Sequence, residues 1–583
     1  MALRPAICGA LVVSIAIALI STSPLAQTPQ QAPVFRAGVT LVPIDVRVLD
    51  RSGKPITDLK AEDFRILEDG VPQPIRHFSA QPVTAGTPDA AVLPRRTAES
   101  SGALAPQNRR LFLIVLGRGR LQEPSKGLDA LLRFVRERLL PQDQVALMAW
   151  NRATDFTTDH AKIAGVIARF RAKHEEIEGL LRGYYTGLAG LYAGRKLPAS
   201  AQARIDEIFS DPLAGGTRET LSDRAITPAE VLAQRTAQDL AARSGIEAFR
   251  QFGGTDNALA DLMAGDTFGL NFDDYVALSR QTLQDVGNLY AGIDYLRFID
   301  GEKHLIFVTE QGFALPSADY DRDLAALASD ARVAIDTIQT GGVHTVLVDN
   351  MPVIPASNTA ALSALRTVSE MSGGQVAIST HAEAAFDRIL NSTGFGYLLG
   401  YSPANSALDG RFRRLKVEVT RRNVTVHHRR GYFNRAQPEH FDPRRSLATT
   451  RISTAANYQE DVRDLDVSIK VNEIRRGDLR TIVVDARVLA NNVIFANIMT
   501  AQGARHLAAL NVAVFCTDQY GADVGELWKT LDITLPPEGL SQARTEGLKF
   551  SLDVPVSKRP RFVKLVVYDY GSDRIGSKYT RLN

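Results

Sequence analysis

Residues 111–116 read Leu-Phe-Leu-Ile-Val-Leu, an unbroken apolar run that decides the class of the fold. A strand that is buried on both faces of a parallel sheet has this composition. Further strand-like runs of this kind occur at 144–150, 304–309, 344–349 and 375–379. Apolar residues with helical spacing lie between some of them, at 362–371 and 385–389. Strands that alternate with helices predict a doubly wound α/β sheet, which we place within residues 109–435.

One long segment departs from this alternation. Between about 161 and 298 the pattern is almost wholly helical, with glycine punctuation. Such a length exceeds that of an ordinary connection between two strands. We therefore expect a helical insert, which is either a separate subdomain or an enlarged crossover.

β-rich segments flank the α/β region. Apolar and polar residues alternate over 42–48, and turn signals follow, which predicts an N-terminal β module at 33–80. Residues 81–108 are rich in Ala, Pro, Thr, Ser and Gly, which is typical of a linker. A second linker is predicted at 436–460. Short alternating strands with turn signals then predict a C-terminal β-sandwich at 461–583.

The first 26 residues have the plan of a secretory signal peptide, with one positive charge at Arg4, an apolar run over 6–20 and small residues up to Ala26. That apolar run is shorter than the ~20 residues that a spanning helix needs. We therefore favour a cleaved signal over a retained membrane anchor, and we expect a periplasmic or secreted protein. Cleavage would leave Cys516 without a disulfide partner, so we expect a buried thiol there.

Charge and motifs exclude several classes of function. The chain has 68 Lys and Arg against 65 Asp and Glu, a net charge of +3, which gives no sign of a nucleic-acid partner. Gly117-Arg118-Gly119 begins like a dinucleotide fingerprint, but Gln122 replaces the third glycine. We predict no cofactor.

Histidines give no convincing metal motif. His174 lacks a second histidine at the spacing of a metal site, and we expect it on a wet helix face. His427 and His428 are adjacent, so on a strand they point to opposite faces, and we expect a surface strand there.

Seven phrases, taken in order, resemble the von Willebrand factor A-related proteins common in Acidobacteria-like genomes. They are VRVLDRSGKPITDLKAEDFRILEDG (46–70), LPQDQVALMAWN (140–151), DFTTD (155–159), DGEKHLIFVTEQGF (300–313), SGGQVAIS (372–379), GYLLGYSP (396–403) and VYDYGSDRIGS (567–577). The resemblance covers nearly all of the chain after residue 26, apart from 161–275. It implies a von Willebrand A-like α/β domain between two β modules, with no established biochemical activity.

The same resemblance directs attention to the end of the first strand. Domains of this kind often bind Mg²⁺ or Mn²⁺ there, through a D-x-S-x-S motif, a loop Thr and an Asp after the fourth strand. Here the segment reads Gly117-Arg118-Gly119-Arg120-Leu121, without a carboxylate or hydroxyl and with two guanidinium groups. Glu310 falls where the Asp is expected, and Thr282 is a possible match for the Thr, although ordinary surface or capping roles suit both. We predict that no metal binds in the usual manner.

The two arginines that stand where the metal ligands are expected suggest a function. Arg118 and Arg120 could hold an acidic group of a partner directly, or they could simply be solvated in a loop that has lost its role. We predict an exported protein-binding or scaffold protein with a degenerate metal-ion-dependent adhesion site and no catalysis. Its contact surface would include Arg118, Arg120, Thr282 and Glu310. A hydrolase or other enzyme with a site in the helical insert, and a metal-dependent adhesin with ligands elsewhere, are the alternatives.

Overall fold

The computed structural model describes residues 41–582, except for 87–108, 195, 211–217, 220–270, 314–318, 343–345, 349–350, 354–355, 379–380, 435–443, 477–478 and 501–502. The predicted signal peptide at 1–26 therefore lies outside the described residues, as does most of the predicted linker at 81–108.

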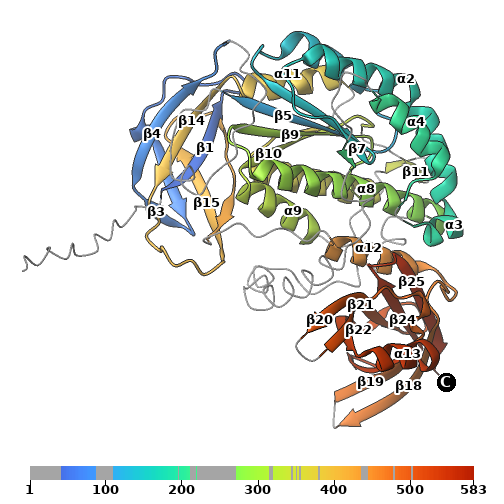
Figure 1. The fold of residues 1–583 in the computed structure, drawn as a ribbon. Helices are drawn as coiled ribbons and strands as arrows, with labels where there is room; N and C mark the ends of the chain where they lie inside the picture. The colour runs from blue at the N-terminus through green and yellow to red at the C-terminus, as the bar shows by residue number, and fades with distance from the viewer. Residues whose placement is uncertain are drawn as a thin grey trace, which may run out of the picture. The chain divides into compact units, whose positions relative to one another are not determined.

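A mostly parallel sheet forms the centre of the α/β region (Figure 1). Among the described residues it has seven strands in the order β13-β10-β9-β5-β6-β7-β8. The five parallel strands are β5 (Arg110–Leu116), β6 (Gln144–Ala149), β9 (Glu302–Thr309), β10 (Val333–Gln339) and β13 (Val376–Ile378). Two short antiparallel strands, β7 (Arg152–Ala153) and β8 (Arg218–Glu219), complete one edge. The prediction of a mixed α/β fold is confirmed.

Helices cover both faces of this sheet. Alternate residues of β5 explain why, because Phe112, Ile114 and Leu116 enter one apolar core while Leu111, Leu113 and Val115 enter another. The first core is closed by α1 (Gly127–Arg133), α2 (His160–Tyr185), α4 (Ala199–Phe209) and α11 (Ala382–Ser392). The second is closed by α8 (Phe272–Arg297), α9 (Asp319–Asp330) and α10 (Ala356–Ser372). An unbroken apolar run is the sequence that such a two-sided burial requires.

The described part of the helical insert belongs to this layered arrangement. It consists of α2, the short α3 (Gly187–Tyr192), α4 and α8. Because α2 and α8 pack on opposite faces of the sheet, the segment is an enlarged crossover as far as the structure describes it.

One predicted strand lies outside the large sheet, and one strand of that sheet was missed. The apolar run at 344–349 does not join the large sheet, because β11 (Val346–Val348) pairs only with β12 (Met351–Val353) in the described residues. The strand that lies beside β9 is β10, whose sequence includes Asp336, Thr337 and Gln339. These polar side chains are buried and hydrogen-bonded, which a hydropathy pattern does not reveal.

The N-terminal β module is built from two distant parts of the chain, which corrects the predicted boundaries 33–80 and 109–435. Its first part provides β1 (Val42–Leu49), β2 (Phe64–Glu68), β3 (Val71–Gln73) and β4 (Ile75–Pro82). Its second part provides β14 (Phe395–Tyr401), β15 (Phe412–Val419), β16 (Thr425–His427) and β17 (Gly431–Phe433). In the described residues they form two four-stranded sheets, β16-β1-β14-β4 and β17-β15-β2-β3, around one core. We call this unit the composite sandwich; the α/β region is inserted between β4 and β14.

The C-terminal segment is β-rich, as predicted. One sheet contains β18 (Val467–Arg476), β19 (Leu479–Val488) and β23 (Leu548–Val556). The other contains β20 (Ala496–Thr500), β21 (Gly503–Thr517), β22 (Asp523–Leu535), β24 (Phe562–Asp569) and β25 (Arg574–Arg581). Apolar residues from both sheets share one core, which also contains Cys516 as a buried free thiol. The short helix α13 (Pro537–Glu546) lies between β22 and β23 in the chain.

The predicted linker at 436–460 is corrected in part. It contains the helix α12 (Arg444–Asn457), whose Ala448, Ile452 and Ala455 are buried against residues of the C-terminal sheets. An alanine- and threonine-rich helix with few large apolar residues has a weak amphipathic pattern, so the sequence resembles a polar connection.

Among the helices that the structure describes, none is long and apolar enough to cross a membrane.

Ile44 tests the composite sandwich, because it is fully buried in β1 and its register partner Leu399 comes from β14. We expect Ile44→Ala to lower the free energy of unfolding by about 2–5 kcal/mol, the usual cost of such a cavity. Val71→Ala, at an exposed position of the same module, should change it by no more than about 0.5 kcal/mol. Denaturant unfolding measures both, and equal effects would contradict the proposed core.

Candidate functional site

The loop after β5, residues 117–121, lies where the order of the sheet reverses. Numbered along the chain, the seven described strands of the sheet have the order 4-3-2-1-5-6-7, so the first and fifth strands, β5 and β9, are neighbours. Ligands of open α/β sheets bind outside the carboxyl ends of the strands at this point. The Gly117 N–H donates to the Val308 carbonyl at 2.8 Å, which fixes the loop against the end of β9.

Arg118 does not face solvent. Its side chain is buried, and its Nε donates to both carboxylate oxygens of Glu178 on α2, at 2.8 and 3.0 Å. Burial lowers the pKa of Arg118, but the nearby acidic groups, Glu178 foremost, together outweigh this, so the pKa is raised. The guanidinium is therefore a permanent positive charge with an internal counter-ion.

A second carboxyl group holds the backbone of the same residue. The Arg118 N–H donates to Asp285 on α8, at 2.9 Å from Oδ1 and 3.2 Å from Oδ2. Burial raises the pKa of Asp285 well above its usual range, against the opposing effect of Arg118. Asp285 therefore acts here as a hydrogen-bonding group that fixes the loop, while Glu178 carries the compensating charge.

Trp150, just after β6, completes the surroundings of Glu178. Its indole Nε1 donates to Glu178 Oε1 at 2.8 Å. Its backbone has a φ of 49°, in the left-handed region that L-residues rarely occupy. The Trp150 carbonyl accepts hydrogen bonds from Gln284 at 2.7 Å and Asn288 at 2.8 Å, both on α8. These bonds stabilise a backbone conformation that costs roughly 1–3 kcal/mol by itself.

Arg120 differs from Arg118 in its exposure. Its Nε lies 3.1 Å from Glu310 Oε1, and its backbone N–H donates to Glu310 Oε2 at 2.7 Å. Glu310 is almost fully buried, whereas the Arg120 side chain is 64% exposed. Gly119 permits this arrangement, because its φ is 99° and a Cβ there would lie 2.5 Å from Glu310 Oε2.

The structure thus brings together three of the four predicted site residues, Arg118, Arg120 and Glu310. Thr282 is buried on α8, in the same helix as Gln281, which donates to the Arg118 carbonyl at 2.9 Å. The prediction that Arg118 faces a partner is corrected, since Glu178 already binds its guanidinium. Glu178, Asp285 and Trp150 were missed, and no signal in the helical pattern distinguishes these carboxylates from solvated ones.

Two expectations for the histidines are also wrong. His174 is buried rather than wet, and its ring stacks on Phe170 with a centroid distance of 5.2 Å. His428 is buried, and His427 is partly buried. Burial lowers the pKa of His427 and of His428 to about 4. Both are neutral at physiological pH.

The described residues contain no cluster of three or more His, Cys, Asp or Glu side chains arranged to hold a metal ion. Near the loop, Glu178 and Glu310 already accept hydrogen bonds from arginines. Comparison with protein-family models, with curated proteins and with solved structures finds no match to this chain.

Glu178 tests the internal ion pair. Glu178→Ala leaves the Arg118 guanidinium buried without a counter-ion, so we expect a loss of about 3–5 kcal/mol in the free energy of unfolding. Replacing the pair together, with Arg118→Met and Glu178→Leu, should recover most of that loss, because neither charge then remains buried. Arg133→Ala, which breaks the exposed Arg133–Glu383 pair, is the matched control and should cost at most about 1 kcal/mol. Chemical denaturation of the four proteins measures these effects, and a tolerated Glu178→Ala would refute the assignment.

Proposed function

We propose that this chain is an exported protein-binding or scaffold protein of the von Willebrand factor A type, without catalysis. Its metal site is replaced by an internal guanidinium–carboxylate pair. The strand order of the sheet, its antiparallel edge and the helices on both faces support the assignment of the fold. The signal-like residues 1–26 support export to the periplasm or beyond the cell.

The observation that carries the proposal is the buried contact between Arg118 and Glu178. A divalent ion at this edge would need oxygen ligands with free lone pairs and a net negative surrounding. Here the Arg118 guanidinium lies at this edge, and the nearby carboxylates accept hydrogen bonds from N–H groups. A second cation would meet repulsion and would have to displace these donors.

Arg120 is the residue that we assign to partner contact. Its Nε is bound to Glu310, while most of the side chain is exposed at the carboxyl edge of the sheet. A planar guanidinium anchored on one side is well suited to bind a carboxylate on its other side, because less side-chain freedom is lost on binding. An acidic side chain of a protein partner fits this chemistry. The β modules act as spacers or secondary contacts.

Metal titration is the first test. We expect no saturable heat when Mg²⁺ or Mn²⁺ is titrated calorimetrically into the full chain, since the described carboxylates beside the loop already accept hydrogen bonds from N–H groups. Saturable binding that is lost in Glu310→Gln would contradict the proposal and favour a metal-dependent adhesin.

Affinity capture from the cells that produce the protein is the second test. We expect Arg120→Ala to lose specific partners that the unchanged protein retains, with losses of tenfold or more for a charge-assisted contact. Arg411→Ala is the matched control, because Arg411 is 67% exposed and also faces a carboxylate, Asp409, but lies in the composite sandwich. Quantitative mass spectrometry compares the captured proteins. Equal recovery with Arg120→Ala and with the unchanged protein would exclude Arg120 from the contact.

A further inference from the structure

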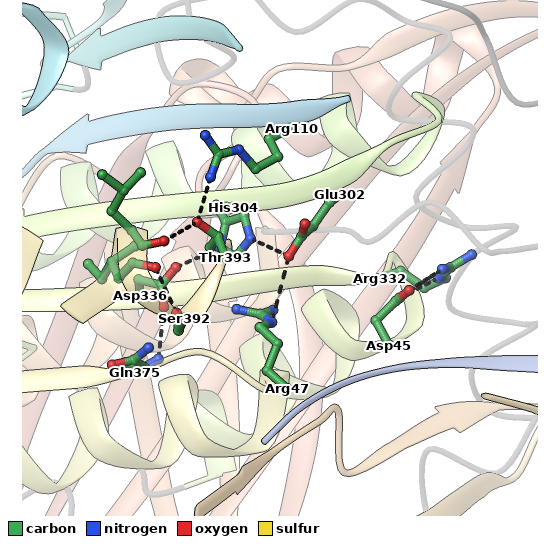
Figure 2. Close-up of polar contacts among 12 residues, drawn as sticks. Asp45, Arg47, Arg110, Glu302, His304, Arg332, Asp336, Gln375, Ser392 and Thr393 are labelled. Carbon is green, nitrogen blue, oxygen red and sulfur yellow. Dashed lines mark hydrogen bonds and ion pairs between the residues drawn. The ribbon is translucent and has the colours of Figure 1, made fainter. Parts of the chain in front are cut away.

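A second charged cluster lies at the amino edge of the same sheet, where the composite sandwich contacts it (Figure 2). His304 on β9 is fully buried, and each of its ring nitrogens faces a carboxylate. Nδ1 lies 2.9 Å from Asp336 Oδ2 on β10, and Nε2 lies 3.1 Å from Glu302 Oε1. The other oxygen of Asp336 accepts the Gln375 N–H at 2.8 Å.

The two contacts of His304 require one proton more than a neutral imidazole and two ionised carboxylates carry. A neutral imidazole donates from one nitrogen only, so it cannot donate to two ionised carboxylates at once. Burial and the Arg47 guanidinium lower the pKa of His304, but its bonds to Asp336 and Glu302 outweigh them, and the pKa is raised. Burial raises the pKa of Glu302, yet His304 and Arg47 lower it overall. The proton therefore resides on the imidazole, and Glu302 keeps its negative charge.

The same carboxylate connects the sheet to the composite sandwich. Arg47 on β1 lies with its Nε 3.7 Å from Glu302 Oε1, and its guanidinium is buried. Within the described part of the chain, the Nε and Nη1 of Arg47 make no hydrogen bond. Beside it, Arg332 donates to both oxygens of Asp45 on β1, at 2.8 and 2.7 Å. Charged side chains from both parts therefore form the contact between the composite sandwich and the sheet.

The balance of charge in this interface depends on His304. The titratable and charged groups that face it are Glu302 on β9, Asp336 on β10, Arg110 on β5 with its partner Asp143, Arg47 on β1 and His427 on β16. Arg110 and Asp143 neutralise each other, and His427 is uncharged. Protonated His304 makes its set with Arg47, Glu302 and Asp336 neutral, whereas loss of the proton leaves one uncompensated buried negative charge.

We propose that His304, Glu302, Asp336 and Arg47 form a buried proton-binding site that couples docking of the composite sandwich on the sheet to pH. The bound proton holds the two parts together, and its release weakens the contact.

The direction of the effect follows from linkage. When the sandwich leaves the sheet, the imidazole meets water and its pKa returns toward its ordinary value of about 6.5. The docked state has the higher pKa, so it binds the proton more tightly. Its contribution to stability is fully present below about pH 6.5 and is lost as the pH rises through the raised value.

Nuclear magnetic resonance of protein labelled selectively at histidine shows directly whether the His304 ring carries a proton on each nitrogen. An imidazole with an ordinary pKa is about nine-tenths neutral at pH 7.5. We expect His304, assigned by its disappearance in His304→Gln, to carry protons on both nitrogens at that pH. If His304→Gln fails to fold, the unchanged protein should still show a doubly protonated ring at pH 7.5. A spectrum in which every ring is neutral at pH 7.5 would overturn the proposal.

The pH dependence of unfolding measures how strongly proton binding at His304 stabilises the folded protein. Between pH 7 and 8 the unfolding equilibrium constant of the unchanged protein should rise by up to tenfold more per pH unit than that of His304→Gln, because unfolding releases one proton. Glu302→Gln should reduce the dependence in the same window. His506→Gln, in the C-terminal β20–β21 hairpin, is the matched control and should retain it. Parallel pH profiles for the unchanged protein and His304→Gln would refute the coupling.

Discussion

A positive charge that is buried at the end of a strand must have a counter-charge beside it, and this constraint organises the carboxyl edge of the sheet. The Arg118 guanidinium is met by Glu178 from α2, and the indole of Trp150 after β6 donates to the same carboxylate. Asp285 from α8 holds the Arg118 backbone. This ion pair and the hydrogen bonds around it join two helices to two strand ends, and Arg120 lies on the exposed side of that arrangement.

The two edges of the sheet use different cations, and the difference has a physical consequence. A guanidinium stays charged at any physiological pH, whereas an imidazole changes its charge near neutrality. The charge of Arg120 at the proposed contact surface is therefore constant over the physiological pH range. The junction between sheet and composite sandwich, where His304 lies between two carboxylates, responds to pH. The proposed partner contact and the proposed proton-binding site therefore use separate groups at opposite ends of β9.

Local sequence patterns predicted the strands whose side chains are apolar and buried along their whole length. The run 111–116 identified a strand that is buried on both sides, because successive side chains enter two apolar cores. β10 was missed because Asp336 and Thr337 interrupt its apolar pattern, and their buried partners are distant in sequence. Pairing of β1 with β14 joins residues about 350 apart, which no local pattern specifies. Arg118, Arg120 and Glu310 were placed together correctly, but Glu178 resembled any other helix carboxylate.

The central claim is that the protein's own guanidinium provides the cation at the reversal point of the sheet. A crystal structure from crystals soaked in Mn²⁺, with anomalous diffraction recorded at the manganese edge, tests it most directly. We predict no anomalous peak among Arg118, Glu178, Asp285 and Glu310, and density for Arg118 bound to both oxygens of Glu178. A manganese ion coordinated by these carboxylates, with the Arg118 side chain displaced toward solvent, would contradict the account.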